Sequence, residues 1–242
     1  RREWEHAHQQ KQKALLALTR AAQISDAAAA FRRVTEVAAE ILGVARVSIW
    51  LSAADGSGMR CADLHEAQPR RHTEGAELSR ADYPRYFAAL EENRTLVANH
   101  AQTDPATSEL AAGYLIPLDI SSMLDAPIRA GGRVVGVVCH EHIGAARVWE
   151  AEELGFAGSL ADLVAFVIEQ RDLRKAERAL RESEERYALA ALGANDGLWD
   201  WNLRDNAIFY SPRFLELLGA DGAPESTRGA NAWLARVHPD DL

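Results

Sequence analysis

Cysteine is scarce in this sequence of 242 residues, basic residues are outnumbered by acidic ones, and long apolar runs are missing. The two cysteines, Cys61 and Cys139, are too few for a disulfide framework and are typical of a reducing compartment. A formal charge of −9 argues against nonspecific binding to nucleic acid or to an anionic membrane, because both need a basic surface. No apolar run approaches the roughly 18 residues of a membrane span. We therefore expect a cytoplasmic protein with no membrane span in this segment.

An opening methionine and a signal-peptide pattern are also missing, since the sequence begins Arg1-Arg2-Glu3-Trp4. This start predicts that the chain is a piece of a longer protein. Hydrophobic residues make up 48% and charged residues 26%, which is the balance of a folded globular protein and excludes a disordered one. The length corresponds to about one and a half domains of roughly 150 residues each.

The first quarter of the chain predicts two helices followed by two strands. Residues 6–23 are rich in Ala, Leu, Gln and Lys and contain no Pro or Gly, which favours a helix. A second helix is predicted between an Asp26 cap and a Gly43 stop, with apolar residues at helical spacing between them. Residues 47–51 and 59–65 then read as two strands joined by a polar turn.

The next stretch is less regular. Residues 66–79 are polar and show little periodicity, so we expect a loop there. Pro84 opens a short helix, residues 95–98 predict a short strand, and residues 107–112 predict another brief helix.

The clearest local signal is a hairpin made of residues 121–129 and 133–142, which are β-rich runs joined by a turn of small residues. Both faces of its second run are apolar. The expected faces are Val134 and Val138 on one side, and Val135, Val137 and Cys139 on the other. A strand that is apolar on both sides belongs to a sheet that is covered on both faces.

These elements predict an α+β fold built on an antiparallel sheet. We expect the terminal helices to cover one face and the segment 66–118 to cover the other. Because that segment is too irregular to pack as a tight layer, loops and short helices over the sheet are a natural place for a ligand cavity.

A long helix is predicted from residue 150 to about 187, apolar in its first half and rich in Arg and Glu in its second. After it, residues 198–203 and 207–210 read as two strands, and Ser211 caps a further helix. The domain organisation that we expect is an N-terminal helix extension over 1–13, a first domain over 14–170, a helical linker over 171–187, and a truncated second domain over 188–242.

The first domain resembles a GAF domain in the order of its elements, from the two helices to the closing one. The motifs that carry this resemblance are Val47-Ser48-Ile49-Trp50-Leu51, Asp55-Gly56, Tyr114-Leu115, Ser122-Met123-Leu124-Asp125-Ala126-Pro127-Ile128, Val135-Gly136-Val137-Val138 and Cys139-His140-Glu141-His142. The resemblance implies a sensory domain that stands in front of a signalling output.

Residues 181–242 are similar to the first half of a PAS domain. The matching motifs are Arg181-Glu182-Ser183-Glu184-Glu185-Arg186-Tyr187, Gly197-Leu198-Trp199-Asp200-Trp201-Asn202 and His238-Pro239-Asp240-Asp241. Together the two resemblances imply a sensory fragment of a bacterial multidomain protein, such as a diguanylate cyclase or phosphodiesterase of cyclic di-GMP signalling, or a histidine kinase. The sequence carries no Gly-Gly-Asp-Glu-Phe run, no Glu-Ala-Leu signature and no kinase phosphoacceptor box in the linker.

The expected cavity has a set of candidate lining residues. They are Trp50, Tyr86, Leu90, Tyr114, Met123, Cys139 and Glu141. The alternative is that the aromatic members are simply core residues, because large aromatic side chains bury area wherever they can. The sequence names no cofactor and no ligand.

The run Cys139-His140-Glu141-His142 consists of metal-ligand residue types. In a strand, however, Cys139 and Glu141 point to one face and the two histidines to the other, so the four cannot converge on one ion. We therefore expect no metal site. The Cys-His pair that carries bilin in some phytochrome-like GAF domains sits on a helix, and the enzymes of this fold that reduce methionine sulfoxide need clustered cysteines. We expect neither chemistry here, and read Cys61 and Cys139 as core residues.

The resulting expectation is a noncatalytic sensory module that binds a small molecule or a partner and passes the change through its helical linker to an absent output domain. The competing expectation is a structural dimerisation module with no ligand. A parallel homodimer is predicted because apolar residues recur every seven positions along the linker helix. The residues expected at this contact are Leu15, Leu18, Phe166, Leu173, Leu180 and Tyr187.

Overall fold

The computed structural model describes residues 2–24, 26–194, 196–204, 207–219, 238 and 240. The chain divides into two compact units, Arg1–Leu173 and Arg174–Leu242, which we describe separately. Pro239 and Asp241 of the predicted His-Pro-Asp-Asp motif lie outside the described residues.

The first unit is built on an antiparallel sheet, in which the strand order is β3-β2-β1-β7-β6-β5 and β4 pairs with β2. Two long neighbours, β6 and β7, form the hairpin predicted from the sequence. This sheet and its helices confirm the predicted α+β fold. The strands are β1 (Arg46–Ser52), β2 (Gly58–Glu66), β3 (Arg71–Thr73), β4 (Glu77–Ser79), β5 (Leu96–Ala98), β6 (Ile120–Ala130) and β7 (Arg133–Ile143).

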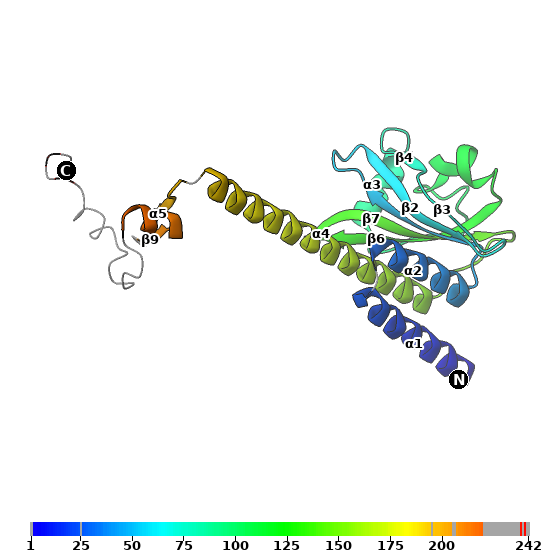
Figure 1. The fold of residues 1–242 in the computed structure, drawn as a ribbon. Coiled ribbons are helices and arrows are strands. Elements are labelled where there is room, and N and C mark those ends of the chain that lie inside the picture. The colour runs from blue at the N-terminus through cyan, green and yellow to red at the C-terminus, as the bar shows by residue number, and fades with distance from the viewer. Residues whose placement is uncertain are drawn as a thin grey trace. The chain divides into compact units, whose positions relative to one another are not determined.

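One face of the sheet is covered by α2 (Ala27–Leu42) and the first part of α4 (Ala151–Ala194), with α1 (Arg2–Ile24) packed against them (Figure 1). The predicted ends of α2 are confirmed. Asp26 accepts a hydrogen bond from the backbone N–H of Ala29 at 2.7 Å, and Gly43 ends the helix with a φ of 60°. A continuous apolar core lies between these helices and the sheet.

The other face carries a second apolar cluster, and the segment above it is the predicted cover. We call this segment the cap, and it comprises α3 (Pro84–Glu92), the 3₁₀ turn η1 (Ser108–Leu110) and the π-helical turn η2 (Ala111–Leu115) with their connections. The sheet therefore separates a helix-covered core from a second core beneath short irregular elements (Figure 1).

Two expectations about the sheet were wrong. Residues 66–79 are not all loop, because β3 and β4 pair with the two ends of β2. Such short strands are fixed by the backbone groups of their neighbour and need no alternating pattern of their own. The predicted faces of Val134 and Val135 are also reversed. The register shifts between Ile128 and Arg129, and Val134 then packs with the cap-side cluster while Val135 packs with the helix-side cluster.

The second unit contains the end of α4, which reaches Ala194 and so continues past the predicted end at about 187. A two-stranded hairpin of β8 (Trp199–Asn202) and β9 (Ala207–Tyr210) follows. A short helix, α5 (Pro212–Leu217), begins with the predicted Ser211 cap, whose hydroxyl accepts a hydrogen bond from the N–H of Phe214. Trp199, Trp201 and Leu203 are exposed.

Candidate functional site

A cavity of about 230 Å³ lies between the cap and the sheet. Six of the seven candidate residues line it, while Leu90 is fully buried nearby and does not. The six are Trp50, Tyr86, Tyr114, Met123, Cys139 and Glu141. Further lining residues, which were not predicted from the sequence, include Glu77, Leu78, Tyr83 and Leu110. The cover comes from the later part of the predicted segment 66–118, because β3, β4 and β5 of that segment belong to the sheet. The signal for a cover was a strand that is apolar on both faces.

The strand geometry explains how the floor of the cavity forms. Cys139 and Glu141 of β7 are two residues apart, so both project toward the cap. Met123 of β6 is the cross-strand partner of Glu141, and Trp50 of β1 is paired with Val137. Four side chains from three central strands therefore share one surface.

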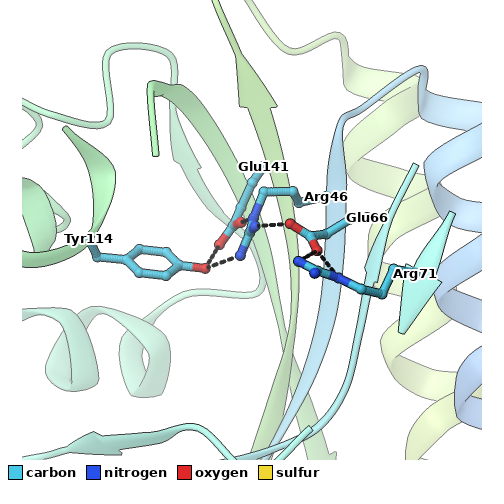
Figure 2. Close-up of polar contacts among 5 residues, drawn as sticks. All are labelled: Arg46, Glu66, Arg71, Tyr114 and Glu141. Carbon is cyan, nitrogen blue, oxygen red and sulfur yellow. Dashed lines mark hydrogen bonds and ion pairs between the residues drawn. The ribbon is translucent and has the colours of Figure 1, made fainter. Parts of the chain in front are cut away.

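A network of buried charges joins this floor to the cap (Figure 2). Arg46 Nε donates to Glu141 Oε2 at 2.8 Å, and Arg46 Nη1 donates to Glu66 Oε1 at 2.8 Å. The Tyr114 hydroxyl, which comes from the π-helical turn, donates to Glu141 Oε1 at 2.7 Å. Arg71 closes the outer end by pairing with Glu66. Glu141 is thus held from both sides, by a cation behind it and by a phenol from the cap.

The pKa values in this network follow from burial and pairing. Burial raises the pKa of Glu141 above its ordinary value, although Arg46 and Tyr114 act in the opposite direction. Burial opposes the charge of Arg46, yet the carboxylate of Glu141 leaves the pKa of that guanidinium above its usual range. Burial and the neighbouring Glu141 also raise the pKa of Tyr114, so this phenol stays protonated and acts as a donor.

A second buried carboxyl group, that of Asp125, lies beside the floor and was not among the candidates. The Tyr86 hydroxyl donates to Asp125 Oδ2 at 2.7 Å and lies 3.6 Å from Cys139 Sγ. Asp125 is fully buried, and within the described residues its Oδ1 has no group in hydrogen-bonding geometry. Burial raises the pKa of Asp125 to about 7, against the hydrogen bond from Tyr86. A carboxyl group in the middle of an otherwise apolar strand was the signal that could have pointed to it.

The cysteines lie on different strands, Cys61 on β2 and Cys139 on β7, and both are buried. Burial raises the pKa of Cys61 to about 12, and burial also raises that of Cys139 well above its usual range. Both groups are therefore protonated thiols near neutral pH, a form that is a poor nucleophile and a poor metal ligand.

The run from Cys139 to His142 alternates as expected. Cys139 and Glu141 line the cavity, whereas the Nδ1 atom of fully buried His140 lies 2.7 Å from the carbonyl oxygen of Leu124. In the described part of the chain, no group of three or more His, Cys, Asp and Glu residues is arranged to hold a metal ion.

The residues expected at a dimer contact fall into two groups. Phe166, Leu173, Leu180 and Tyr187 are all exposed on α4. Leu18, by contrast, is only 3% exposed because it packs inside the helix layer, and Leu15 packs against the same layer. The exposed seven-residue repeat therefore lies on α4 alone.

None of the described helices is both long enough and apolar enough to cross a membrane. Among curated proteins, the chain is similar to the hybrid signal transduction histidine kinase A of Dictyostelium discoideum, with 38% identity over 53 residues. This match covers 22% of the chain and spans 2% of the length of that kinase.

Solved structures share the fold at low sequence identity. The phycocyanobilin-bound GAF domain of a cyanobacterial phytochrome matches at 20% identity with a TM-score of 0.58, covering 68% of this chain and 96% of that one. Free methionine-R-sulfoxide reductase from Neisseria meningitidis matches at 14% identity with a TM-score of 0.56, covering 68% of this chain and 91% of that one. The GAF domain of an Acinetobacter phosphoenolpyruvate-protein phosphotransferase matches at 13% identity with a TM-score of 0.56, covering 66% of this chain and 93% of that one.

The GAF domain family matches residues 26–168, which is more than half of the chain. The matched range begins at Asp26, the N-cap residue of α2, and ends within the buried part of α4. It therefore contains the whole sheet, the segment that we call the cap, and the cavity. The sequence match and the shared fold agree, and the chain belongs to the GAF domain family.

Proposed function

We propose that this chain is a noncatalytic sensory module that binds a small molecule in the cavity between the cap and the sheet. The observation that carries the proposal is the convergence of six candidate residues, drawn from five segments of the chain, on one cavity. Its polar groups are held in place before any ligand binds, because Glu141 is fixed by Arg46 and Tyr114. Preformed polar groups in an otherwise apolar cavity are typical of ligand sites.

The signal would pass from the cavity to α4 by a shift between two packings. A ligand touching both Tyr83 of the cap and Cys139 of the floor favours the arrangement in which cap and sheet are closed on it. The connection after β7 is tied to the same sheet. The N–H of Arg147 donates to Ser122 Oγ at 2.9 Å, and the N–H of Trp149 donates to Asn99 Oδ1 at 3.1 Å. A change in the sheet therefore has a direct mechanical route to the start of α4.

We assign no catalytic step to the cavity. The thiol of Cys139 is buried beside Tyr86 and Asp125, and burial raises the pKa of all three groups. A buried thiol whose pKa is raised is a poor nucleophile, because little of it is ionised near neutral pH. This chemistry supports binding and argues against turnover.

The parts beyond the GAF domain belong to the same proposal. The β8–β9 hairpin and α5 are the beginning of a PAS domain, and the output is a bacterial signalling domain of the cyclic di-GMP or histidine kinase type. The exposed repeat on α4 makes the chain a parallel homodimer. Its residues Leu173 and Leu180 are 53% and 61% exposed and stand seven residues apart, so a second helix could cover both along one seam.

Native mass spectrometry of the purified chain tests the binding proposal. The wild-type protein should carry a small molecule that dissociates on activation, and Leu110→Trp should lose it, because Leu110 lines the cavity and a larger side chain fills it. Circular dichroism shows whether the variant is folded. A protein with no bound mass that still forms dimers would instead favour the structural dimerisation module.

A further inference from the structure

The side chains that line the cavity carry acidic groups and no basic ones. Glu77 and Glu141 are among them, while no Lys, Arg or His belongs to the described lining. An anionic ligand would therefore meet carboxylates without a facing basic side chain, which is unfavourable because like charges repel. The lining selects against phosphates and carboxylates.

The carboxyl groups around the cavity differ in whether a cation is paired with them. Glu141 pairs with Arg46, and Glu66 pairs with both Arg46 and Arg71. Glu77 forms no ion pair within the described residues. Asp125, behind Tyr86 and Cys139, has one buried oxygen with no group in hydrogen-bonding geometry among the described residues. A positive charge in the cavity would complement Glu77, which lines it, whereas Asp125 lies behind the lining.

Aromatic rings make up much of the remaining lining. Trp50, Tyr83, Tyr86 and Tyr114 come from the sheet and from two parts of the cap, so they approach the cavity from different sides. The indole N–H of Trp50 already donates to Ser48 Oγ at 2.8 Å. The guanidinium of Arg46 lies 6.0 Å from the centre of the Tyr114 ring, so one of these rings already has a cation beside it. Several aromatic rings around one space attract organic cations.

The size of the cavity limits the ligand. A volume of about 230 Å³ corresponds to roughly eight water molecules at about 30 Å³ each. It therefore holds an organic molecule of roughly eight to ten non-hydrogen atoms and is too small for a nucleotide or a bilin without opening of the cap.

From the charge, the aromatic lining and the size, we propose that this cavity binds a small organic ammonium ion. The inference rests on the proposed function, since it names the ligand class of the same site. The ammonium group would lie among the aromatic rings, with Glu77 and Glu141 on its sides, and its short carbon chain would contact Met123 and Leu110.

Three probes of matched shape and different charge test this inference on the 242-residue chain. Choline carries a trimethylammonium group, dimethylbutanol replaces its nitrogen with carbon, and dimethylbutanoate is the corresponding anion. Isothermal titration should show choline binding at least about tenfold more tightly than dimethylbutanol, with dimethylbutanoate weakest. Equal or tighter binding of the neutral alcohol or of the anion would overturn the inference and leave the cavity as a ligand site.

A pair of variants locates the effect. Glu77 and Glu74 are both exposed and both line an open groove outside the cavity, but only Glu77 also lines the cavity. Glu77→Gln should weaken choline binding about threefold to tenfold and leave dimethylbutanol unaffected, whereas Glu74→Gln should change neither. Equal effects of the two variants would mean general surface attraction and would overturn the site. If no probe binds, the ammonium inference fails, while native mass spectrometry decides separately whether the cavity holds any ligand.

Discussion

Arg46 and Glu141 are direct cross-strand partners on β1 and β7, and their side chains form an ion pair with 2.8 Å between Nε and Oε2. The two side chains are 9% and 2% exposed, so this is a buried charge pair in the middle of the sheet. The same carboxylate faces the cavity and accepts a hydrogen bond from the cap through Tyr114. Stability of the sheet and geometry of the site therefore depend on one contact.

Removing Arg46 should strongly destabilise the domain. In Arg46→Met the carboxylate of Glu141 keeps only Tyr114, and a buried charge without its partner costs about 3–5 kcal/mol in the free energy of unfolding. Arg71→Met is the matched control, since the side chain of Arg71 is largely exposed and its loss should cost no more than about 1 kcal/mol. Urea unfolding measures both. Similar values for the two variants would contradict the buried pair.

The site was partly predictable from the sequence because strand alternation has a fixed period. That period places Cys139 and Glu141 on one face, and the apolar character of both faces of this strand indicated that a second layer covers it. Arg46 was not predictable as the partner of Glu141, because the two are 95 positions apart in the sequence and no local sequence pattern indicates that their strands pair. Asp125 was missed for a related reason. Its place beside the cavity follows from its hydrogen bond with Tyr86, which lies in the cap and is distant in the sequence.

The fold was predictable where periodicity or capping is strong, as at Asp26, Gly43 and the β6–β7 hairpin. The fold was not predictable where backbone hydrogen bonding alone determines whether a strand forms. The strands β3 and β4 exist because β2 offers them hydrogen-bonding groups, and their own side chains show no pattern. The register shift near Val134 adds a residue to one strand and so reverses the faces that simple alternation assigns.

Asp125 should make the stability of the protein depend on pH. Burial raises its pKa from an ordinary value of 3.8 to about 7, so the folded chain holds this proton more strongly than the unfolded chain. The stabilisation is fully present below about pH 4 and is lost as the pH rises through 7. Relative to Asp125→Asn, the wild-type protein should therefore lose on the order of 4 kcal/mol between pH 4 and pH 8. A pH-independent difference in unfolding free energy would rule this out.

His140 should act in the opposite direction over a similar range. Full burial lowers its pKa from 6.5 to about 4, so the unfolded chain takes up the proton first as the pH falls. The wild-type protein should lose on the order of 3 kcal/mol relative to His140→Gln between pH 6.5 and pH 4. Because Asp125 and His140 partly cancel in the wild type, each contribution becomes visible only by subtraction of its variant. A constant difference across this range would show that His140 does not titrate there.

The exposed repeat on α4 predicts how the chain self-associates. Phe166, Leu173, Leu180 and Tyr187 fall at seven-residue intervals, and all four are exposed. The positions three residues after the first three of them are Glu169, Ala176 and Ser183, which bury little apolar area. The resulting parallel contact should be weak and easily repacked, as a helix that carries a signal between two states requires.

Sedimentation of the full 242-residue chain tests this contact. The double variant Leu173→Glu and Leu180→Glu should shift dimers to monomers, because it places like charges on the facing surfaces of both helices. Leu189→Glu is the matched control: Leu189 is 68% exposed on the same helix but lies outside the seven-residue repeat, so the dimer should persist. Circular dichroism and thermal unfolding should be unchanged in all of them, since none of the three leucines is buried in the GAF domain. A wild-type chain that sediments as a monomer at tens of micromolar would end the dimer proposal, and the signal would then have to pass along a single helix.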